Sequence, residues 1–526
     1  MRGIIFFLCT VCFVQAQTTI GLLHYNSNVS DGYLLFGHKQ DNDVYLINNC
    51  GEVVNHWLTD NRLGVAYLLD NGNLLKSGGG FLELRDWDNS LLWKVDLTVY
   101  GLDQHHDIEP MPNGNVLVLS RDVYTSAEAI AQGRNPSLVN TELRSEKIVE
   151  IQPVGTNSLN VVWEWKIWDH LIQDFSAAQP NFGVVANHPE LLDLNLGTSS
   201  SNWIHANAVE YNETLDQIVF SSRKMNEIYV IDHSTTILEA ASHTGGNSGK
   251  GGDFLWRWGN PINYDQGTAG DQKLYGQHDP KWIPNGYPNA GKLSLFNNGT
   301  GRTPEYSSVH IIDTQVDING NYSISGSFLP NDFFWSWDGS VLGTTVFSNS
   351  QSGANVQPNG NVLFCETVPG RISEIDSSGN LVWSYENPIG TSNYVQGDMI
   401  PNSQNQVFRA EKYPANFVGF TGKDLTPIGI IENINSISDN CKTLNVEEFV
   451  LGENRFKIYP NPINYEFKIS GEESIESIQV FNLTGKIVLE YTQPLNSYKV
   501  SELPPGMYFV KIRTKKGARI KKIIKE

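Results

Sequence analysis

A repeated β-rich stretch that ends in tryptophan constrains the fold more than any other feature of this sequence. Most copies follow a strand-like run such as VYLIN or IYVID and then a polar turn, and several lie downstream of a hairpin sequence such as YLLDNGNLL, whose turn is Asn-Gly. Each repeat therefore predicts about four short strands, the fourth bearing the tryptophan. The six copies are VVNHW at Trp57, SLLWKV at Trp93, NVVWEW at Trp163, DFLWRW at Trp256, DFFWSW at Trp335 and NLVWSY at Trp383.

Four-stranded units that repeat around an axis form a β-propeller, because one blade cannot bury both of its faces alone. The six tracts span about residues 30–430 and predict an all-β, six-bladed propeller. The spacing of the tryptophans is uneven, so the middle blades are expected to carry long insertions that form loops over one mouth of the ring. The tryptophans themselves are expected to pack between blades.

The two ends of the chain differ from this repeat. Met1-Arg2, an apolar run from Ile4 to Val14 and a cleavage-like sequence before Gln17 predict a signal peptide, and the apolar run is too short to span a bilayer. From Phe456 onward, alternating apolar and polar runs predict a small β-sandwich. The predicted division is a signal peptide at 1–16, the propeller at 17–430, a linker at 431–455 and the C-terminal domain at 456–526.

Charge and motifs exclude several classes of function. The chain has 37 basic and 57 acidic residues, a net charge of −20, which argues against nucleic acid or an anionic membrane as a partner. The glycine-rich run 245–250 ends in lysine but lacks the spacing of a nucleotide-binding loop. No cofactor and no transmembrane segment are therefore expected.

Three cysteines remain after removal of the signal peptide: Cys50, Cys365 and Cys441. They do not have metal-ligand spacing. Cys50 and Cys365 could pair if the chain closes into a ring, and the sequence leaves this open.

Three histidines occupy one equivalent position of consecutive repeats. His106, His205 and His278 each lie seven residues before an asparagine of a hairpin turn. The first strand of a propeller blade lines the axial channel, so the three imidazoles are expected to converge near the axis.

Hairpin symmetry adds further polar groups. His205 and Arg223 are symmetric about residue 214, so an antiparallel hairpin brings them to the same end, and Asn207 shares a strand face with His205. Arg121 is placed in the same way relative to His106. Imidazoles with a guanidinium suit a tetrahedral oxyanion such as sulfate. Each histidine alone could simply form a structural hydrogen bond. The cluster as a whole is also compatible with a metal site. The anion site is preferred, and no metal is expected, because a cation beside Arg223 would be repelled.

The same residues resemble the bacterial arylsulfotransferase family over about residues 30–430. The resemblance rests on His105-His106-Asp107 before PMPNGN, Trp203-Ile204-His205-Ala206-Asn207, Ser221-Ser222-Arg223, Trp256-Arg257-Trp258-Gly259-Asn260-Pro261 and Gln277-His278. It implies a six-bladed propeller that transfers a sulfuryl group from a phenolic sulfate ester to a phenolic acceptor, independently of the nucleotide donor PAPS and by a ping-pong mechanism.

Carried over by residue, the resemblance makes His278 the nucleophile that forms a sulfohistidine. It makes His106, His205, Asn207 and Arg223 the groups that hold the sulfuryl oxygens, with His106 or His205 also transferring the proton. The alternative is a surface propeller that binds sulfated or anionic glycans without chemistry. Retention of all five polar groups favours the enzyme.

The C-terminal segment resembles the type A C-terminal sorting domain of the Bacteroidetes type IX secretion system. This resemblance implies that the secretion machinery is a partner and that the protein is exported across the outer membrane, to be secreted or attached to the cell surface. The matching runs are Tyr459-Pro460-Asn461-Pro462, Phe481-Asn482-Leu483-Thr484-Gly485-Lys486 and Leu503-Pro504-Pro505-Gly506-Met507-Tyr508.

Overall fold

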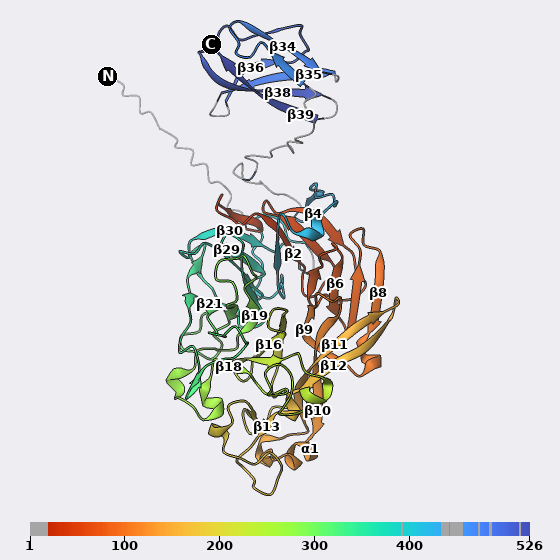
Figure 1. The fold of residues 1–526 in the computed structure, drawn as a ribbon, viewed down its shortest axis with the longest axis vertical. Helices are drawn as coiled ribbons and strands as arrows, with labels where there is room; N and C mark the ends of the chain where they lie inside the picture. Colours follow the sequence, from red (N-terminus) through yellow and green to blue (C-terminus); the bar gives the residue numbers. More distant parts are fainter. Residues whose placement is uncertain are drawn as a thin grey trace, which may run out of the picture. The chain divides into compact units, whose positions relative to one another are not determined.

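The computed structural model describes residues 19–390, 393–432, 441, 456–471, 474–482, 486–514 and 517–526. The chain divides into two compact units, Met1–Ile437 and Ser438–Glu526, and β-strands are the main regular structure of both (Figure 1). The all-β prediction is therefore confirmed. The predicted signal peptide at 1–16 and most of the predicted linker at 431–455 lie outside the described residues, and the division at 17, 430 and 456 stays a prediction.

The first unit contains six antiparallel sheets of four or five strands among its described residues, an arrangement that fits the predicted propeller. In order along each sheet, the strands are β31 (Glu411–Pro414), β2 (Gly32–Phe36), β3 (Val44–Asn48), β4 (Glu52–Trp57) and β32 (Gly429–Ile430); β5 (Ala66–Leu68), β6 (Leu74–Gly78), β7 (Phe81–Arg85) and β8 (Leu91–Asp96); β9 (Asp103–Pro110), β10 (Val116–Thr125), β11 (Glu142–Val154) and β12 (Ser158–Lys166); β15 (Ala206–Asn212), β16 (Gln217–Ser222), β17 (Glu227–Asp232) and β18 (Trp256–Trp258); β19 (His278–Trp282), β20 (Leu293–Asn297), β21 (Ser308–Ile312) and β24 (Trp335–Trp337); and β27 (Gly353–Val356), β28 (Val362–Glu366), β29 (Arg371–Ile375), β30 (Leu381–Glu386) and β1 (Gly21–Tyr25).

Tryptophans on the Trp-bearing strands connect each sheet to the next. In every sheet an indole N–H donates a hydrogen bond to a polar oxygen of the following sheet or its turns, and the sixth bond returns to the first sheet. Burying an indole requires such a partner for its N–H, so the repeat places both the apolar contact and its polar anchor. The bonds are Trp57 to Asp86 O, Trp93 to Ser158 O, Trp163 to Thr235 Oγ1, Trp256 to Leu329 O, Trp337 to Gly379 O and Trp383 to Asn49 O.

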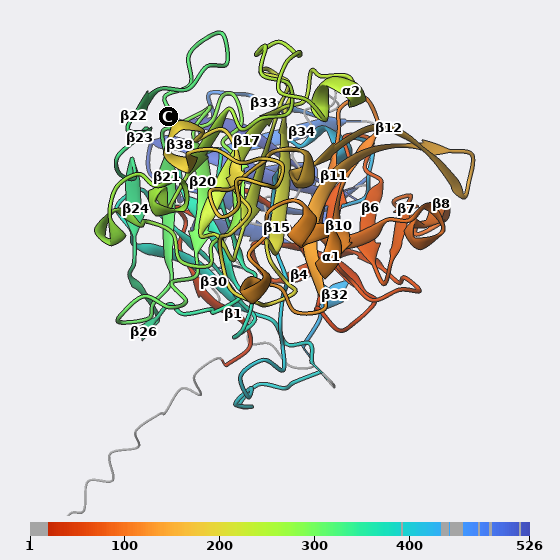
Figure 2. The ribbon, with the colours of Figure 1, turned by 90° about the horizontal axis from the view of Figure 1, so that it is seen from below.

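Strands from the two ends of the first unit complete its first and last sheets. β1 pairs with β30, the fourth strand of the last sheet, whereas β31 pairs with β2 of the first sheet. The sheets follow one another around the unit in chain order, so the red and cyan ends of the unit lie side by side (Figure 1). In the view from below, β15 lies near the centre and the fourth strands β8 and β24 lie towards opposite edges (Figure 2).

Insertions between strands hold the short helices and strand pairs of the first unit, with the longest in the middle sheets, as the tryptophan spacing predicted. The segment between β12 and β15 contains two short strands that pair in parallel, β13 (Leu171–Ile172) and β14 (Leu192–Asp193). The other elements of the insertions and loops are α1 (Ser126–Ala131), α2 (Ile237–Ala240), η1 (Leu97–Tyr100), η2 (Pro136–Leu138), η3 (Ile167–Asp169), η4 (Val185–Asn187), η5 (Pro261–Tyr264), η6 (Ala269–Asp271), η7 (Val418–Phe420), β22 (Ile324–Ser325), β23 (Ser327–Phe328), β25 (Ser340–Val341) and β26 (Thr344–Thr345).

The second unit is a small β-sandwich of two sheets whose apolar side chains share one core. This core includes Phe467, Val480 and Val510, which are completely buried. Its sheets are β33 (Phe456–Tyr459), β34 (Glu466–Gly471) and β37 (Tyr498–Lys499); and β36 (Ile487–Tyr491), β35 (Ile475–Phe481), β38 (Gly506–Thr514) and β39 (Gly517–Lys525).

The disulfide between Cys50 and Cys365 that the sequence left open is not formed. Cys365 carries a free, buried thiol, whereas Cys50 and Cys441 are disulfide-bonded. A bond between Cys50 and Cys365 is therefore excluded. Burial raises the pKa of the Cys365 thiol well above its usual value, so this residue is an inert part of the core.

Candidate active site

Three neighbouring first strands, β9, β15 and β19, each carry a β-bulge at or next to the predicted histidine. The register shifts fall between Val118 and Ser120 opposite β9, and between His278 and Lys281 on β19, with a third shift on β15. His106 (φ 63°), His205 (φ 50°) and Asp279 (φ 58°) adopt left-handed backbone conformations. Such conformations are costly for residues other than glycine, and bulges re-aim side chains beside functional sites.

The bulges bring the three predicted histidines together. The Nε2 atoms of His106 and His205 are 3.1 Å apart, and the ring centroids of His106 and His278 are 6.3 Å apart. His105 joins them, with its ring 4.3 Å from that of His106 and 5.0 Å from that of His205. The site is therefore a cluster of four imidazoles, one more than the sequence predicted.

Hydrogen bonds fix which nitrogen of His278 carries the proton. Its Nδ1 lies 2.8 Å from Oδ1 of Asn298 and 3.0 Å from the carbonyl oxygen of Gly276, and both oxygens are acceptors. The amide of Asn298 cannot flip without loss, because its Nδ2 donates to the carbonyls of Ser348 and Gln351. Nδ1 must therefore hold the hydrogen, which leaves a lone pair on Nε2. That lone pair accepts the backbone N–H of Gln351 at 3.2 Å.

The imidazoles of His205 and His106 form a hydrogen-bonded pair. Nδ2 of Asn202, an amide donor in the insertion before β15, lies 2.6 Å from Nδ1 of His205. Nδ1 of His205 is thus an acceptor, and its Nε2–H donates to Nε2 of His106. The insertion thereby sets the direction of the hydrogen bond between the two rings.

Arg223 lies beside this cluster. Its backbone N–H donates to the carbonyl of His205 at 3.1 Å, and its guanidinium Nη2 donates to the carbonyl of Asn349 at 3.2 Å. The side chain forms no ion pair with a carboxylate among the described residues. Its charge acts on both His205 and His278 and contributes to lowering their pKa values. An unpaired, half-buried guanidinium is a receptor for an anion.

Asn207 and Arg121 are placed differently. Asn207 is fully buried, and one N–H of its amide donates to the carbonyl of Gln277 at 2.7 Å, which ties β15 to the residue before His278. Arg121 forms an ion pair with Asp103, at 3.1 Å, so its charge is already compensated. Arg223 is thus the arginine of the two that is available to a ligand.

Burial keeps all four imidazoles neutral. It lowers the pKa of His105, His205 and His278 to about 3, with neighbouring cations and imidazoles adding to the effect. Burial also lowers the pKa of His106 well below its usual value. At neutral pH each ring is therefore an uncharged nitrogen base or hydrogen-bond donor.

Two polar networks support the cluster, and sequence reasoning missed both. Arg409 donates to both carboxylate oxygens of Asp107 at 2.9 Å, and its Nε lies 3.2 Å from Asp279 Oδ1. His105 Nδ1 lies 3.0 Å from Oε1 of Glu146, whose carboxyl pKa is raised well above its usual value by burial. Asp107 and Asp279 each follow a predicted histidine in the sequence. Arg409 lies near the C-terminal end of the first unit in the sequence, and no motif identified it.

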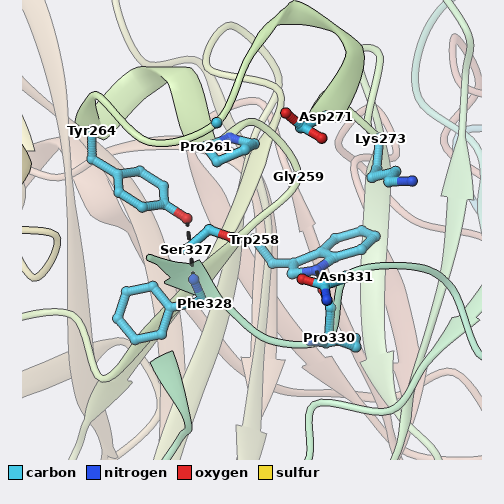
Figure 3. Close-up of a pocket in the computed structure, with 11 residues that line it drawn as sticks. Trp258, Gly259, Pro261, Tyr264, Asp271, Lys273, Ser327, Phe328, Pro330 and Asn331 are labelled. Carbon is cyan, nitrogen blue, oxygen red and sulfur yellow. Dashed lines mark hydrogen bonds between the residues drawn. The ribbon is translucent and has the colours of Figure 1, made fainter. Parts of the chain in front are cut away.

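The ligand atoms of His105, His106 and His205 lie within 4.8 Å of one another, a geometry that is also compatible with a metal ion. A separate surface pocket lies between Trp258, Tyr264 and Phe328 (Figure 3), with the Tyr264 hydroxyl 3.4 Å from the backbone nitrogen of Phe328. The lining of this pocket includes none of the predicted site residues, so the histidine cluster is the candidate site.

Fold and site together define a β-propeller-like enzyme whose first strands converge on neutral imidazoles and a free guanidinium. Comparison with protein families gives the class. The chain belongs to the arylsulfotransferase (ASST) family, whose model matches residues 23–380, and it is a sulfotransferase. A second model, the secretion system C-terminal sorting domain, matches residues 457–526. The sorting domain marks the protein for export, to the cell surface or into the medium. No helix among the described residues is long and apolar enough to cross a membrane.

Other comparisons give only distant likenesses. No match was found among the curated proteins. A protein of unknown function from Bacteroides caccae is 12% identical, with a TM-score of 0.39, and the match covers 72% of this chain and 98% of that one. Streptogramin B lyase is 10% identical with a TM-score of 0.35, over 77% and 96% of the two chains. PorZ, a surface component of the type IX secretion system of Porphyromonas gingivalis, is 10% identical with a TM-score of 0.28, over 95% and 74%.

Proposed function

We propose that the first unit is a six-bladed propeller that moves a sulfuryl group from a phenolic sulfate ester to a phenol by a ping-pong mechanism through His278. No PAPS takes part. The observation that carries the proposal is the state of His278, a neutral imidazole whose proton is fixed on Nδ1 and whose Nε2 lone pair lies in a cluster with an unpaired guanidinium. Under this proposal the donor and the acceptor are small phenolic molecules.

In the first half-reaction, Nε2 of His278 attacks sulfur, the N–S bond forms and the bond from sulfur to the phenolic oxygen breaks. The phenoxide leaves with the electron pair, and the sulfonated imidazole gains a positive charge that balances the charge of the sulfuryl group. Asn298 Oδ1 and the Gly276 carbonyl stabilise this charge through Nδ1–H. The lone pair must first release the Gln351 N–H, which is then free to donate to a sulfuryl oxygen. Splitting the transfer into two steps makes each step easier.

The second half-reaction reverses these events with a new phenol. The acceptor hydroxyl gives its proton to a base, and its oxygen attacks sulfur while the N–S bond breaks. The hydrogen-bonded pair of His205 and His106 supplies a neutral base for this proton. Under this proposal Arg223 and the second N–H of Asn207 hold the sulfuryl oxygens throughout. The charge of Arg223 acts on His205 and His278, and Asn207 is hydrogen-bonded to the residue before His278.

Rapid mixing of the full chain with 4-nitrophenyl sulfate, without acceptor, tests the proposal. We expect a burst of one nitrophenolate per active chain, together with a mass increase of one sulfuryl group on the protein. Adding phenol should remove that mass and produce phenyl sulfate. Saturable binding of sulfated glycans without a burst would instead support a binding protein, and steady release of nitrophenolate without a labelled protein would contradict the covalent intermediate.

The rate of the first half-reaction is expected to stay constant within about twofold from pH 8 down to pH 5. Burial lowers the pKa of His278 to about 3, so the nucleophile is deprotonated throughout this range. A histidine with an ordinary pKa near 6.5 would make the rate about tenfold lower at pH 5.5. The measurement is kcat/KM for nitrophenol release in samples quenched with alkali, and a tenfold fall by pH 5.5 would rule out a nucleophile of such low pKa.

Stability needs a control in the same pH series. The unfolded chain protonates histidine at about pH 6.5, whereas the folded chain resists protonation of His105, His205 and His278 down to about pH 3. Their contribution to stability is therefore complete above about pH 6.5 and is lost as the pH falls towards 3. Circular dichroism at each pH separates a loss of fold from a loss of chemistry.

We propose also that the chain is divided as its sequence suggests, into a signal peptide at 1–16, the propeller at 17–430, a linker at 431–455 and the sorting domain at 456–526. The two compact units and the two family matches support this division. The sorting domain would engage the type IX secretion machinery, since its family is described as a secretion system C-terminal sorting domain.

A further inference from the structure

We propose that His170, His243 and Asp253 form a binding site for a divalent transition-metal ion, with zinc as the best fit. The ligand atoms of these three side chains lie within 4.8 Å of one another. None of the three belongs to the candidate active site, so the inference does not depend on the proposed function.

Three separate segments supply the ligands. His170 directly follows η3, His243 lies in the loop after α2, and Asp253 lies in the approach to β18. Trp165 holds the first and third segments together, because its ring stacks parallel to that of His170 and its indole N–H donates to the carbonyl of Gly252 at 2.7 Å. Gly252 allows this close approach, since a Cβ there would lie 2.6 Å from Nε2 of His170.

The hydrogens of His170 cannot satisfy both of its contacts in the neutral state. Its Nε2 lies 2.8 Å from the carbonyl of Ala240, which only accepts, so Nε2 must carry the hydrogen. A neutral imidazole has one such hydrogen, so Nδ1 presents a lone pair. That lone pair faces Oδ1 of Asp253 at 2.8 Å, which is also an acceptor. Either a hydrogen on one of the two atoms or a metal ion between them must therefore resolve this contact.

The surroundings favour the metal ion. Nδ1 of His243 also lies 2.8 Å from the same Oδ1, so two imidazole nitrogens converge on one carboxylate oxygen. Two histidines and one carboxylate form a common zinc ligand set, and the bond from Nε2–H of His170 to a backbone carbonyl is the usual outer-sphere partner of a zinc-bound histidine.

The geometry requires only a small adjustment. Ligand atoms about 2.0 Å from a tetrahedral zinc ion lie about 3.3 Å apart, so the two 2.8 Å contacts must lengthen by about half an ångström. The side chain of His243 is 60% exposed and is free to move outward. This exposure also leaves the fourth position open to water. Bound zinc would tie the loop after α2 to the buried end of η3.

Zinc chloride titrated into the chelator-treated full chain tests the site by calorimetry and by thermal unfolding. Two variants separate it from other histidines: His243→Ala, which removes an exposed ligand, and His188→Ala as a matched control. His188 is also exposed and lies 2.9 Å from a carboxylate oxygen of Glu190, but it belongs to no three-ligand cluster among the described residues. The comparison is needed because the cluster of His105, His106 and His205 also presents three imidazoles.

We expect the wild type and His188→Ala to bind one zinc ion with the same affinity. His243→Ala should bind this ion at least tenfold more weakly, because even the loss of an outer-sphere contact weakens metal binding tenfold or more and a lost ligand costs more than that. At a hundredfold excess over the wild-type Kd, zinc should raise the unfolding temperature by about 2 °C in the first two proteins and by about half of that or less in His243→Ala. Asp253→Asn, which keeps the shape and removes the charge, should behave like His243→Ala. An isotherm that neither His243→Ala nor Asp253→Asn changes would overturn the proposal and leave only a hydrogen bond between His170 and Asp253.

Discussion

His278→Ala is expected to abolish the burst of nitrophenolate and the mass increase on the protein, and to lower turnover by about 10⁴-fold. A nucleophile that forms a covalent intermediate has no substitute when its side chain is removed, and losses of this order follow for such residues. Alanine also leaves the acceptors on Asn298 and Gly276 without a donor. Stopped-flow absorbance and intact mass on the same sample measure both effects.

The loss must arise from chemistry and not from the fold. Circular dichroism and the unfolding temperature of His278→Ala provide the first control, because the side chain is buried and its removal costs some stability. Added imidazole provides the second, since a small nitrogen base entering the vacated space should restore part of the turnover without labelling the protein. A full burst in the variant would assign the nucleophile to another imidazole of the cluster.

Arg223→Met should lower kcat by about 10²- to 10³-fold, with a smaller change in KM. In the proposed mechanism the guanidinium holds the sulfuryl oxygens in the transition state, and removing one such donor costs about 3 to 4 kcal/mol of transition-state stabilisation. Methionine keeps most of the length and the apolar stem of the side chain. Steady-state kinetics with 4-nitrophenyl sulfate and phenol give both constants.

Arg121→Met is the matched control for this prediction. Sequence symmetry gives both arginines the same relation to a histidine, but only Arg121 has a carboxylate partner, Asp103. Its replacement should therefore change kcat by less than about threefold. Equal losses in the two variants would contradict the assignment of Arg223 as the anion-binding arginine, and a loss confined to KM would give Arg223 a role in binding only.

Local sequence pattern predicted the strands and the places of the site residues along them. The Trp-bearing runs lie in the fourth strand of their sheets. The position seven residues before the turn places His106 within β9, His205 directly before β15 and His278 at the start of β19. Pattern works here because a hairpin turn fixes the register of its two strands, and a repeated register gives equivalent positions. The pairing of Arg223 with His205 depends on the same local rule.

Local sequence pattern could not predict contacts between segments that are distant in the sequence. Arg409 reaches Asp107 across the unit, Asn298 orients His278 from a neighbouring strand end, and Cys365 stays free while Cys50 is disulfide-bonded. Each depends on which turns and loops meet after the sheets assemble.

The sequence by itself determined the all-β class, the family and which histidines occur at one repeat position, because these depend on short-range periodicity and turn chemistry. The tertiary structure alone decided the protonation and pairing of the polar groups, including Nδ1–H on His278, the ion pair of Arg121 with Asp103 and the lack of a carboxylate partner for Arg223 among the described residues. Burial and long-range hydrogen bonds control those properties, and both arise only when the sheets pack against one another.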